Sequence, residues 1–181
     1  MKYAQIRSMD ISNGEGVGVA LFIQGCPAPH CKGCFNPETW DFNGGEEWTD
    51  ETEEGFLKLI NKPYIKRISI LGGEPLADKN LDGVLKLINK IRSKFPSKTI
   101  WLYSGYEYKY IFRGDPSLIS KEGYHNYKRR KIIESVDVLV DGKYIEELRD
   151  ISLHWRGSSN QRVIDVQKSL KKGEIILWDT N

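Results

Sequence analysis

Short hydrophobic runs recur along the chain, and most of them end at glycine or at a polar residue. Runs of this length, bounded by turn-forming residues, are typical of strands buried inside a sheet. The pattern predicts strands at residues 17–23, 65–71, 99–103, 136–140, 162–166 and 174–178.

Between these runs, hydrophobic residues recur at helical spacing. One helix is predicted over residues 50–60, a second from residue 81 up to Pro96, and a third over about residues 125–134. Residues 113–124 contain two glycines and a proline, which indicates a surface loop.

Strands that alternate with helices favour parallel β-α-β units and therefore an α/β fold. The 181 residues suit one domain, spanning residues 1–181. A closed barrel of eight such units needs about 200 to 250 residues or more, so we expect a partial, open parallel β/α barrel. Functional residues in such folds follow the carboxyl ends of the strands. The expected site comprises Gln24-Gly25, Gly72-Gly73-Glu74, Ser104-Gly105 and Asp141-Gly142.

The charges nearly balance, with 27 lysine and arginine residues against 25 aspartate and glutamate residues. Such a balance gives no field that would steer the whole protein onto nucleic acid or anionic lipid, and neither is expected as a partner. Residues 1–10 contain no apolar leader, and the longest apolar runs are too short to cross a membrane. We therefore expect a cytoplasmic protein with reduced thiols.

The three cysteines, Cys26, Cys31 and Cys34, lie within nine residues, directly after the first predicted strand. An odd, clustered set argues against a disulfide framework and favours a metal centre. Structural zinc needs a fourth protein ligand, and His30 is badly placed because it adjoins Cys31. An iron–sulfur cluster normally takes four thiolates, so three would leave one iron open to a small molecule. On spacing alone, zinc, a cluster and three unligated thiols all stay open.

A second motif favours the cluster. Gly72-Gly73-Glu74-Pro75 ends the second predicted strand. With the cysteine loop, it resembles the radical S-adenosylmethionine superfamily, whose hallmark is a three-cysteine loop after the first barrel strand. Further segments resemble the anaerobic ribonucleoside-triphosphate reductase-activating proteins, and the last of them is specific to that family. These segments are residues 13–16, 25–27, 34–40, 136–142 and 156–165.

One spacing departs from that family. Its loop is Cys-x3-Cys-x2-Cys, whereas four residues separate Cys26 from Cys31 here. An extra residue can bulge outward without moving the ends of a loop, so we still expect cluster ligation. Gly33 occupies the position where many superfamily members carry an aromatic residue, which leaves Phe35 as the nearer candidate to pack beside the cofactor.

The resemblance implies a [4Fe-4S] cluster held by Cys26, Cys31 and Cys34, with S-adenosyl-L-methionine on the fourth iron. Reductive cleavage would give methionine and a 5′-deoxyadenosyl radical, which takes hydrogen from a glycine of the large subunit of the anaerobic reductase. A flavodoxin-type protein is the expected one-electron donor, and no acid–base catalytic residue is required. The expected contacts to S-adenosyl-L-methionine are Gly72, Gly73, Glu74, Ser104, Asp141 and Lys143.

Two other functions are consistent with the sequence. The first is activation of a different glycyl-radical enzyme, although such activases often carry extra cysteines for added clusters. The second is a zinc-stabilised module that binds protein or nucleic acid, for which residues 128–131 and 171–172 provide basic runs. Iron with acid-labile sulfide would indicate an enzyme, and zinc alone would indicate the module.

Overall fold

The structure is a computed structural model that describes residues 1–112 and 121–179. Strands and helices alternate through most of these residues. The strands are β1 (Lys2–Asp10), β2 (Gly18–Ile23), β3 (Glu46–Glu47), β4 (Arg67–Gly72), β5 (Thr99–Ser104), β6 (Val138–Asp141) and β7 (Arg162–Asp165). The helices are α1 (Asp50–Ile60), α2 (Leu81–Lys94), α3 (Tyr108–Ile111), α4 (Lys121–Glu134) and α5 (Val166–Lys172), with short 3-10 turns η1 (Pro37–Thr39) and η2 (Glu146–Leu148).

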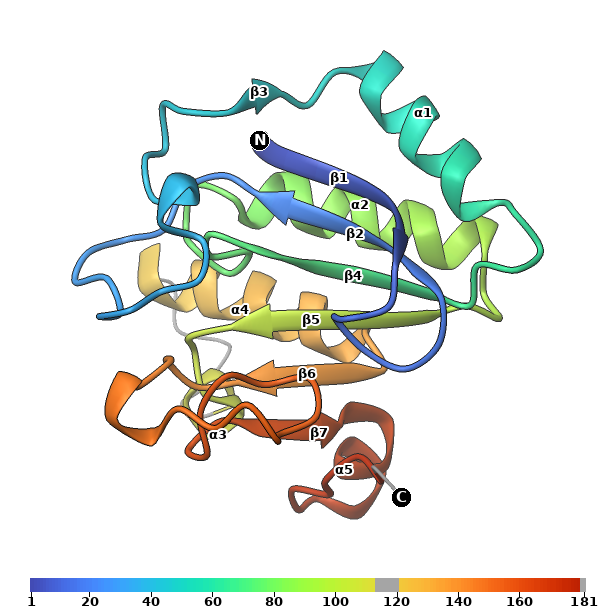
Figure 1. Ribbon diagram of the computed structural model, residues 1–181. Coiled ribbons are helices and arrows are strands. Elements are labelled where there is room, and N and C mark those ends of the chain that lie inside the picture. The colour runs from blue at the N-terminus through green and yellow to red at the C-terminus, as the bar shows by residue number, and fades with distance from the viewer. Residues whose placement is uncertain (113–120, 180–181) are drawn as a thin grey trace.

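In the part of the chain that the structure describes, seven strands form one sheet in the order β3-β1-β2-β4-β5-β6-β7. The four central strands run parallel, with Ile23 of β2 opposite Gly72 of β4 and Ser104 of β5 opposite Asp141 of β6. The edge strands β1, β3 and β7 run antiparallel to their neighbours. Figure 1 shows an open sheet whose parallel strands all end on the left. The α/β class is confirmed, but the expected parallel pairing is limited to the four central strands.

The first strand has no counterpart among the predicted strands. β1 lies near the edge of the sheet, between β2 and the two-residue β3, and most of its side chains are exposed or half-buried. An antiparallel strand with a solvated face tolerates polar residues. Its sequence therefore contains no apolar run that would indicate it.

The C-terminal segment also differs from the prediction. β7 ends at Asp165, whose side chain accepts a hydrogen bond from the backbone nitrogen of Lys168 (2.9 Å) and so caps α5. That helix ends at Gly173, which has a φ of 73°. Residues 174–178 form no strand, although Leu177 pairs with Ile164 in an isolated bridge.

The predicted loop at residues 113–124 is partly wrong. α4 begins at Lys121, so residues 121–124 belong to a helix that starts earlier than expected. Residues 113–120 lie outside the described part of the chain.

The main hydrophobic core lies between the sheet and the helices. Figure 1 shows α2 and α4 side by side behind the sheet, and the two helices contact each other. The predicted helical faces supply this core, with Phe56 from α1 and Ile88 from α2 fully buried against strand residues such as Leu21 and Ile70. Each such side chain stabilises the fold by about 1.5–3 kcal/mol. No helix among the described residues is long and apolar enough to cross a membrane.

The opposite side of the sheet, here called the open face, carries two smaller apolar clusters. One contains Trp101, Val140 and Val163, and the other contains Phe22 and Leu71. In the described residues, no helix contributes a side chain to either cluster. The open face therefore has room for a cavity above the sheet.

A buried arginine holds the loop after β1 on the open face. Arg67, at the start of β4, is fully buried, and its guanidinium donates to the Asp10 carboxylate (3.0 Å) and to the backbone carbonyls of Asn13 (2.6 Å) and Glu15 (3.2 Å). A buried charge is tolerated only when it is paired and hydrogen-bonded. This network anchors the connection between β1 and β2 beneath the cavity.

Candidate functional site

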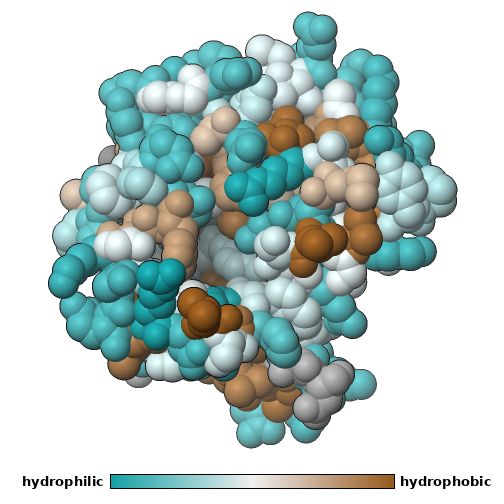
Figure 2. Space-filling model, viewed as in Figure 1, coloured by the Kyte–Doolittle hydropathy of each residue, from teal (hydrophilic) through white to brown (hydrophobic). Residues whose placement is uncertain are grey.

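A cavity of about 920 Å³ lies on the open face, where the parallel strands end. Its volume is in the range of cofactor and ligand sites. Figure 2 shows this side of the molecule hollowed near its middle, with hydrophobic side chains at the margins. Asp141 is not part of the lining. The predicted site residues that do line the cavity are Cys26, Cys31, Cys34, Gly72, Gly73, Glu74, Ser104 and Lys143.

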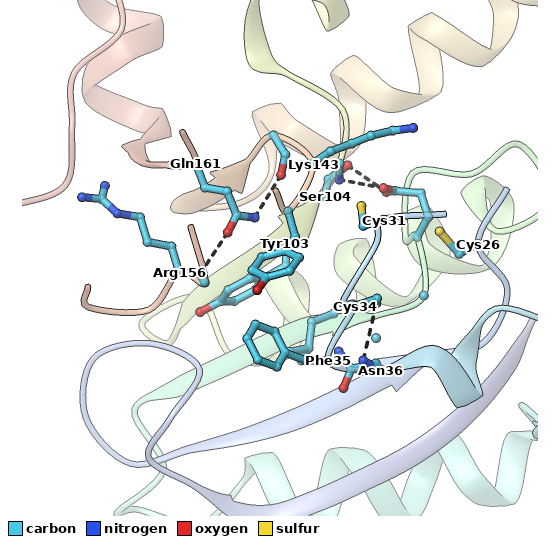
Figure 3. A pocket seen from close by; sticks show the side chains of 18 of the residues that line it. Cys26, Cys31, Cys34, Phe35, Asn36, Tyr103, Ser104, Lys143, Arg156 and Gln161 are labelled. Carbon is cyan, nitrogen blue, oxygen red and sulfur yellow. Dashed lines mark hydrogen bonds between the residues drawn. The ribbon is translucent and has the colours of Figure 1, made fainter. Parts of the chain in front are cut away.

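The cysteine loop connects β2 to η1 and forms one wall of the cavity (Figure 3). Cys26, Cys31 and Cys34 are half-buried, whereas residues 27–30 and 32–33 between them are exposed. The extra residue of the Cys-x4-Cys spacing therefore lies in an outward segment, as the sequence suggested, and the three cysteines share the inner side of the loop.

The backbone at position 33 of this loop adopts a left-handed conformation that favours glycine. Gly33 has a φ of 72°, and a Cβ there would lie 2.0 Å from the Glu146 carboxylate. Phe35, two residues on, lines the cavity and packs against the Tyr144 ring at a centroid distance of 5.0 Å. A Cβ at Gly157 would lie 2.8 Å from the Phe35 ring and 3.0 Å from that of Tyr144. The two aromatic rings thus pack across a glycine of the 156–165 segment.

The loop offers no fourth ligand for zinc. His30 stacks on Trp40 at a centroid distance of 4.2 Å, and its Nε2 lies 3.0 Å from the carbonyl oxygen of Cys26. Among the described residues, no three histidine, cysteine, aspartate or glutamate side chains come close enough together to hold one metal ion. Cys26, Cys31 and Cys34 are among the described side chains to which this applies.

Two of the thiols, those of Cys26 and Cys31, lie where burial disfavours the thiolate form. Burial raises the pKa of Cys26 to about 11, and the negative charge of Glu74 acts in the same direction. Burial also raises the pKa of Cys31. Lys143 lowers both pKa values, and its Nζ donates to the carbonyl of Pro29 within the loop (3.2 Å). Because thiolates are the ligating form, metal binding at these cysteines releases protons.

The diglycine turn after β4 lies against the loop after β2. The backbone nitrogen of Gly73 donates to the carbonyl of Ile23 (2.8 Å), and a Cβ at Gly73 would lie 2.5 Å from the carbonyl oxygen of Gly25. Gly72 has a φ of 107°, and its Cβ would lie 2.7 Å from the Ile23 oxygen. Both positions need glycine because backbone meets backbone there.

Glu74 is buried and holds two strand ends together. Its Oε1 accepts from the Leu76 nitrogen (2.9 Å) and the Ser104 hydroxyl (2.8 Å), and its Oε2 accepts from the Gly105 nitrogen (2.8 Å). Burial raises the pKa of Glu74, against the opposing effect of these hydrogen bonds and of Arg129. A carboxylate offers about four acceptor positions, so one position on Oε2 stays available.

Ser104 and Asp141 are bonded within the protein. The Ser104 hydroxyl donates to Glu74 and accepts from the Tyr106 nitrogen (3.0 Å). The Asp141 carboxylate is buried and pairs with Arg162 through two hydrogen bonds, one of them from Nε at 2.9 Å. Each side chain therefore links the end of its strand to a neighbouring segment.

The 156–165 segment clamps the loop that follows β6. Gln161 donates from Nε2 to the Gly142 carbonyl and accepts at Oε1 from the Gly157 nitrogen, both at 2.9 Å (Figure 3). Asn160 donates to the carbonyl of Lys143 (2.8 Å). The segment thus fixes the position of Lys143 relative to the cysteine loop.

Residues 12–164 match a protein family described as a 4Fe-4S single cluster domain. The anaerobic ribonucleoside-triphosphate reductase-activating protein of Escherichia coli (strain K12) is 38% identical over 165 residues, covering 90% of this chain and 97% of that protein. Proteins of the same name from Vibrio cholerae and Enterobacteria phage T4 are 37% and 34% identical, each over 163 residues. These matches cover 89% and 90% of this chain and 96% and 93% of the respective relatives. The chain belongs to this family of activating proteins.

The family match covers the whole candidate site. It begins before the cysteine loop and ends at residue 164, within β7. The resemblance inferred from the cysteine loop, the diglycine motif and the 156–165 segment is confirmed for the activating-protein family.

The predicted site residues do not include Tyr103 and Trp155, which are among the aromatic residues of the cavity wall. Tyr103 of β5 and Trp155 line it from the open face. The alternation along β5 contains the signal for Tyr103, since Ile100 and Leu102 join the main core while Trp101 packs on the open face with Tyr103. Trp155 follows no periodic pattern and adopts a φ of 59°, so no sequence signal points to it.

Proposed function

We propose that this chain is a radical S-adenosylmethionine activase that forms a glycyl radical on an anaerobic ribonucleoside-triphosphate reductase. One observation carries the proposal: the half-buried cysteines of one loop and the diglycine–glutamate turn line the same cavity at the ends of parallel strands. In this proposal the open sheet is a partial barrel of the radical S-adenosylmethionine type, and residues 1–181 form one such domain.

Cys26, Cys31 and Cys34 would ligate three irons of a [4Fe-4S] cluster. The donor set fits because the three thiols are on the inner side of one loop and the sequence contains no fourth cysteine. One iron would then be open to S-adenosyl-L-methionine. The cluster would supply the electron that cleaves the sulfonium S–C bond, which would give methionine and a 5′-deoxyadenosyl radical able to take hydrogen from the target glycine.

The turn after β4 is proposed to bind the methionyl ammonium. Gly72 and Gly73 bring backbone against the cavity, and Glu74 has one acceptor position left on Oε2. An ammonium donates three hydrogen bonds and is stabilised by a buried carboxylate. Ser104 orients Glu74 through its hydroxyl.

Lys143 is proposed to contact the carboxylate of S-adenosyl-L-methionine. It is exposed at the cavity wall and donates to the carbonyl of Pro29 in the cysteine loop. Asp141 is proposed to act as a positioning residue, because its pairing with Arg162 holds the end of β6 just before Lys143.

The large subunit of the reductase is the proposed partner, and it would deliver its glycine to the cavity across the open face. The names of the relatives support this partner. A flavodoxin-type protein is proposed as the electron donor.

Anaerobic reconstitution with iron and sulfide tests the proposal. We expect a reducible [4Fe-4S] cluster, reductant-dependent formation of 5′-deoxyadenosine, and a glycyl-radical electron paramagnetic resonance signal once the reductase is added. Binding of zinc without a reducible cluster would overturn the proposal. Cleavage without a radical on this reductase would instead favour activation of a different glycyl-radical enzyme.

The negative control for this experiment is a triple variant in which alanine replaces Cys26, Cys31 and Cys34. None of the three cysteines belongs to a hydrophobic cluster. The variant should therefore unfold at the same urea concentration as the metal-free wild type while losing the cluster and 5′-deoxyadenosine formation. A large drop in its unfolding midpoint would show that the thiols have a structural role.

A further inference from the structure

The hydroxyl of Tyr103 has no hydrogen-bond partner among the described residues. Its oxygen is buried. The ring projects into the cavity (Figure 3) and packs among apolar side chains that include Phe22, Leu71 and Trp155. Buried hydroxyls nearly always find a partner because an unpaired one destabilises the fold.

A second unpaired donor lies in the same cavity. The Nε of Arg156 is buried and bonds to no described residue, and Arg156 lines the cavity together with Tyr103. By contrast, Asn160, Gln161 and Arg162 of the same segment all donate hydrogen bonds within the protein. Tyr103 and Arg156 are thus two hydrogen-bond donors that lack acceptors.

Two large hydrophobic residues of the cavity lining are exposed to solvent. Ile151 is 91% exposed, and Phe35 is 59% exposed. Large hydrophobic residues gathered at the mouth of a cavity mark a surface that another molecule covers. A polypeptide supplies both the apolar surface for these residues and the carbonyl acceptors for the interior.

We infer that Tyr103 donates a hydrogen bond to a backbone carbonyl of the glycine-bearing segment of the reductase, with Arg156 as a second donor to that backbone. This inference rests on the proposed function. The reacting residue is a glycine and has no side chain, so the cavity can recognise it only through its backbone groups and the space around its Cα. Hydroxyl and guanidinium donors in an apolar pocket match carbonyl acceptors.

The test compares Tyr103→Phe with Tyr3→Phe in the reconstituted protein. Tyr3→Phe is the matched control, since its hydroxyl donates to Glu46 and is absent from the cavity lining. For Tyr103→Phe we expect about a tenfold weaker association with the reductase and about a tenfold rise in 5′-deoxyadenosine formed per glycyl radical. Arg156→Lys, which keeps the charge but lacks Nε–H, should shift both quantities in the same direction.

Thermal unfolding of the metal-free chains separates recognition from a structural role. Tyr103→Phe removes an unpaired buried hydroxyl, so its unfolding midpoint should equal or exceed that of the wild type. A lower midpoint would overturn the inference, as would unchanged association and coupling. Loss of cleavage by Tyr103→Phe when the reductase is absent would overturn it too, because the tyrosine would then serve S-adenosyl-L-methionine. Failure of the wild type itself to cleave would overturn the proposed function and this inference with it.

Discussion

The turn after β4 admits no side chain at position 73. A Cβ on Gly73 would lie 2.5 Å from the carbonyl oxygen of Gly25, and neither backbone segment is free to move because the two are hydrogen-bonded through Ile23 and Glu74. Gly73→Ala should therefore lower the free energy of unfolding by about 1–3 kcal/mol. Urea unfolding of the metal-free chain measures this change.

Gly55→Ala is the control for that substitution. Gly55 lies inside α1, and a Cβ there would meet no atom within 4 Å. Alanine is the better helix former, so this variant should gain about 0.5–1 kcal/mol. Similar losses in both variants would contradict the argument from close backbone approach.

At the residue scale, the sequence predicted site residues that lie in one short motif, but it did not predict contacts between residues from different segments. The three cysteines and Gly72-Gly73 were found because their spacing is local. The pairing of Asp141 with Arg162 depends on the antiparallel register of β6 and β7, which no local pattern contains. Whether Tyr103 faces the cavity or the main core likewise depends on which side of the sheet the helices cover.

At the scale of elements, Glu53 connects α1 with α2. Burial alone would raise the pKa of Glu53, but hydrogen bonds from Lys90 and Trp48 outweigh it and lower that pKa below its usual value. A lowered pKa stabilises the fold above the usual pKa, and this stabilisation is lost as the pH falls through the folded-state pKa. Glu53→Gln should therefore reduce stability near pH 7, and the difference from wild type should shrink towards about pH 3.

Urea unfolding at the two pH values checks this prediction. Glu54→Gln is the control, because Glu54 is the exposed neighbour on the same helix. It should change stability little at either pH. A pH-independent difference between Glu53→Gln and the wild type would contradict the assigned cause.

The Arg67 network makes a second prediction at this scale. Arg67→Met would remove the guanidinium that neutralises the buried Asp10 carboxylate and that donates to the carbonyls of residues 13 and 15. Removing one partner of a buried ion pair costs about 3–5 kcal/mol. Faster proteolysis within residues 11–17 should accompany the lower free energy of unfolding, whereas Lys66→Met, at the exposed neighbouring residue, should change neither.

Element prediction succeeded where hydrophobic side chains face the main core. β2, β4, β5, α1 and α2 all have apolar faces buried against one another, and their sequence patterns report that burial. β1 was missed because polar residues occupy most of its exposed positions and it therefore contains no apolar run. α5 was missed because a single capping residue, Asp165, converts the end of an apolar run into a helix start.

For the whole molecule, α2 and α4 lie on the side of the sheet opposite the open face (Figure 1). This arrangement predicts which backbone segments a bound partner protects from hydrogen exchange. Under the proposed function, the reductase covers the open face and its cavity. Its addition should slow backbone exchange in residues 26–36 and 142–161, while α2 and α4 exchange as before. Mass spectrometry of the complex measures this, and protection centred on the helices would contradict the proposed docking direction.

The alternation of strands and helices was enough to predict an α/β fold with an open sheet. It was not enough to predict that the strands near the edges run antiparallel. The strands that pair with β1 and β7 are determined by contacts between residues far apart in the chain. Chain length excluded a closed barrel, and the strand order leaves β3 and β7 at separate edges, in agreement with that expectation.

The packing of Phe35 and Tyr144 across Gly157 has an evolutionary consequence. A methyl group at position 157 would lie 2.8 Å from the Phe35 ring and 3.0 Å from the Tyr144 ring. A side chain there therefore requires at least one ring to shift or to be replaced by a smaller side chain. Positions 35, 144 and 157 are accordingly expected to covary among relatives.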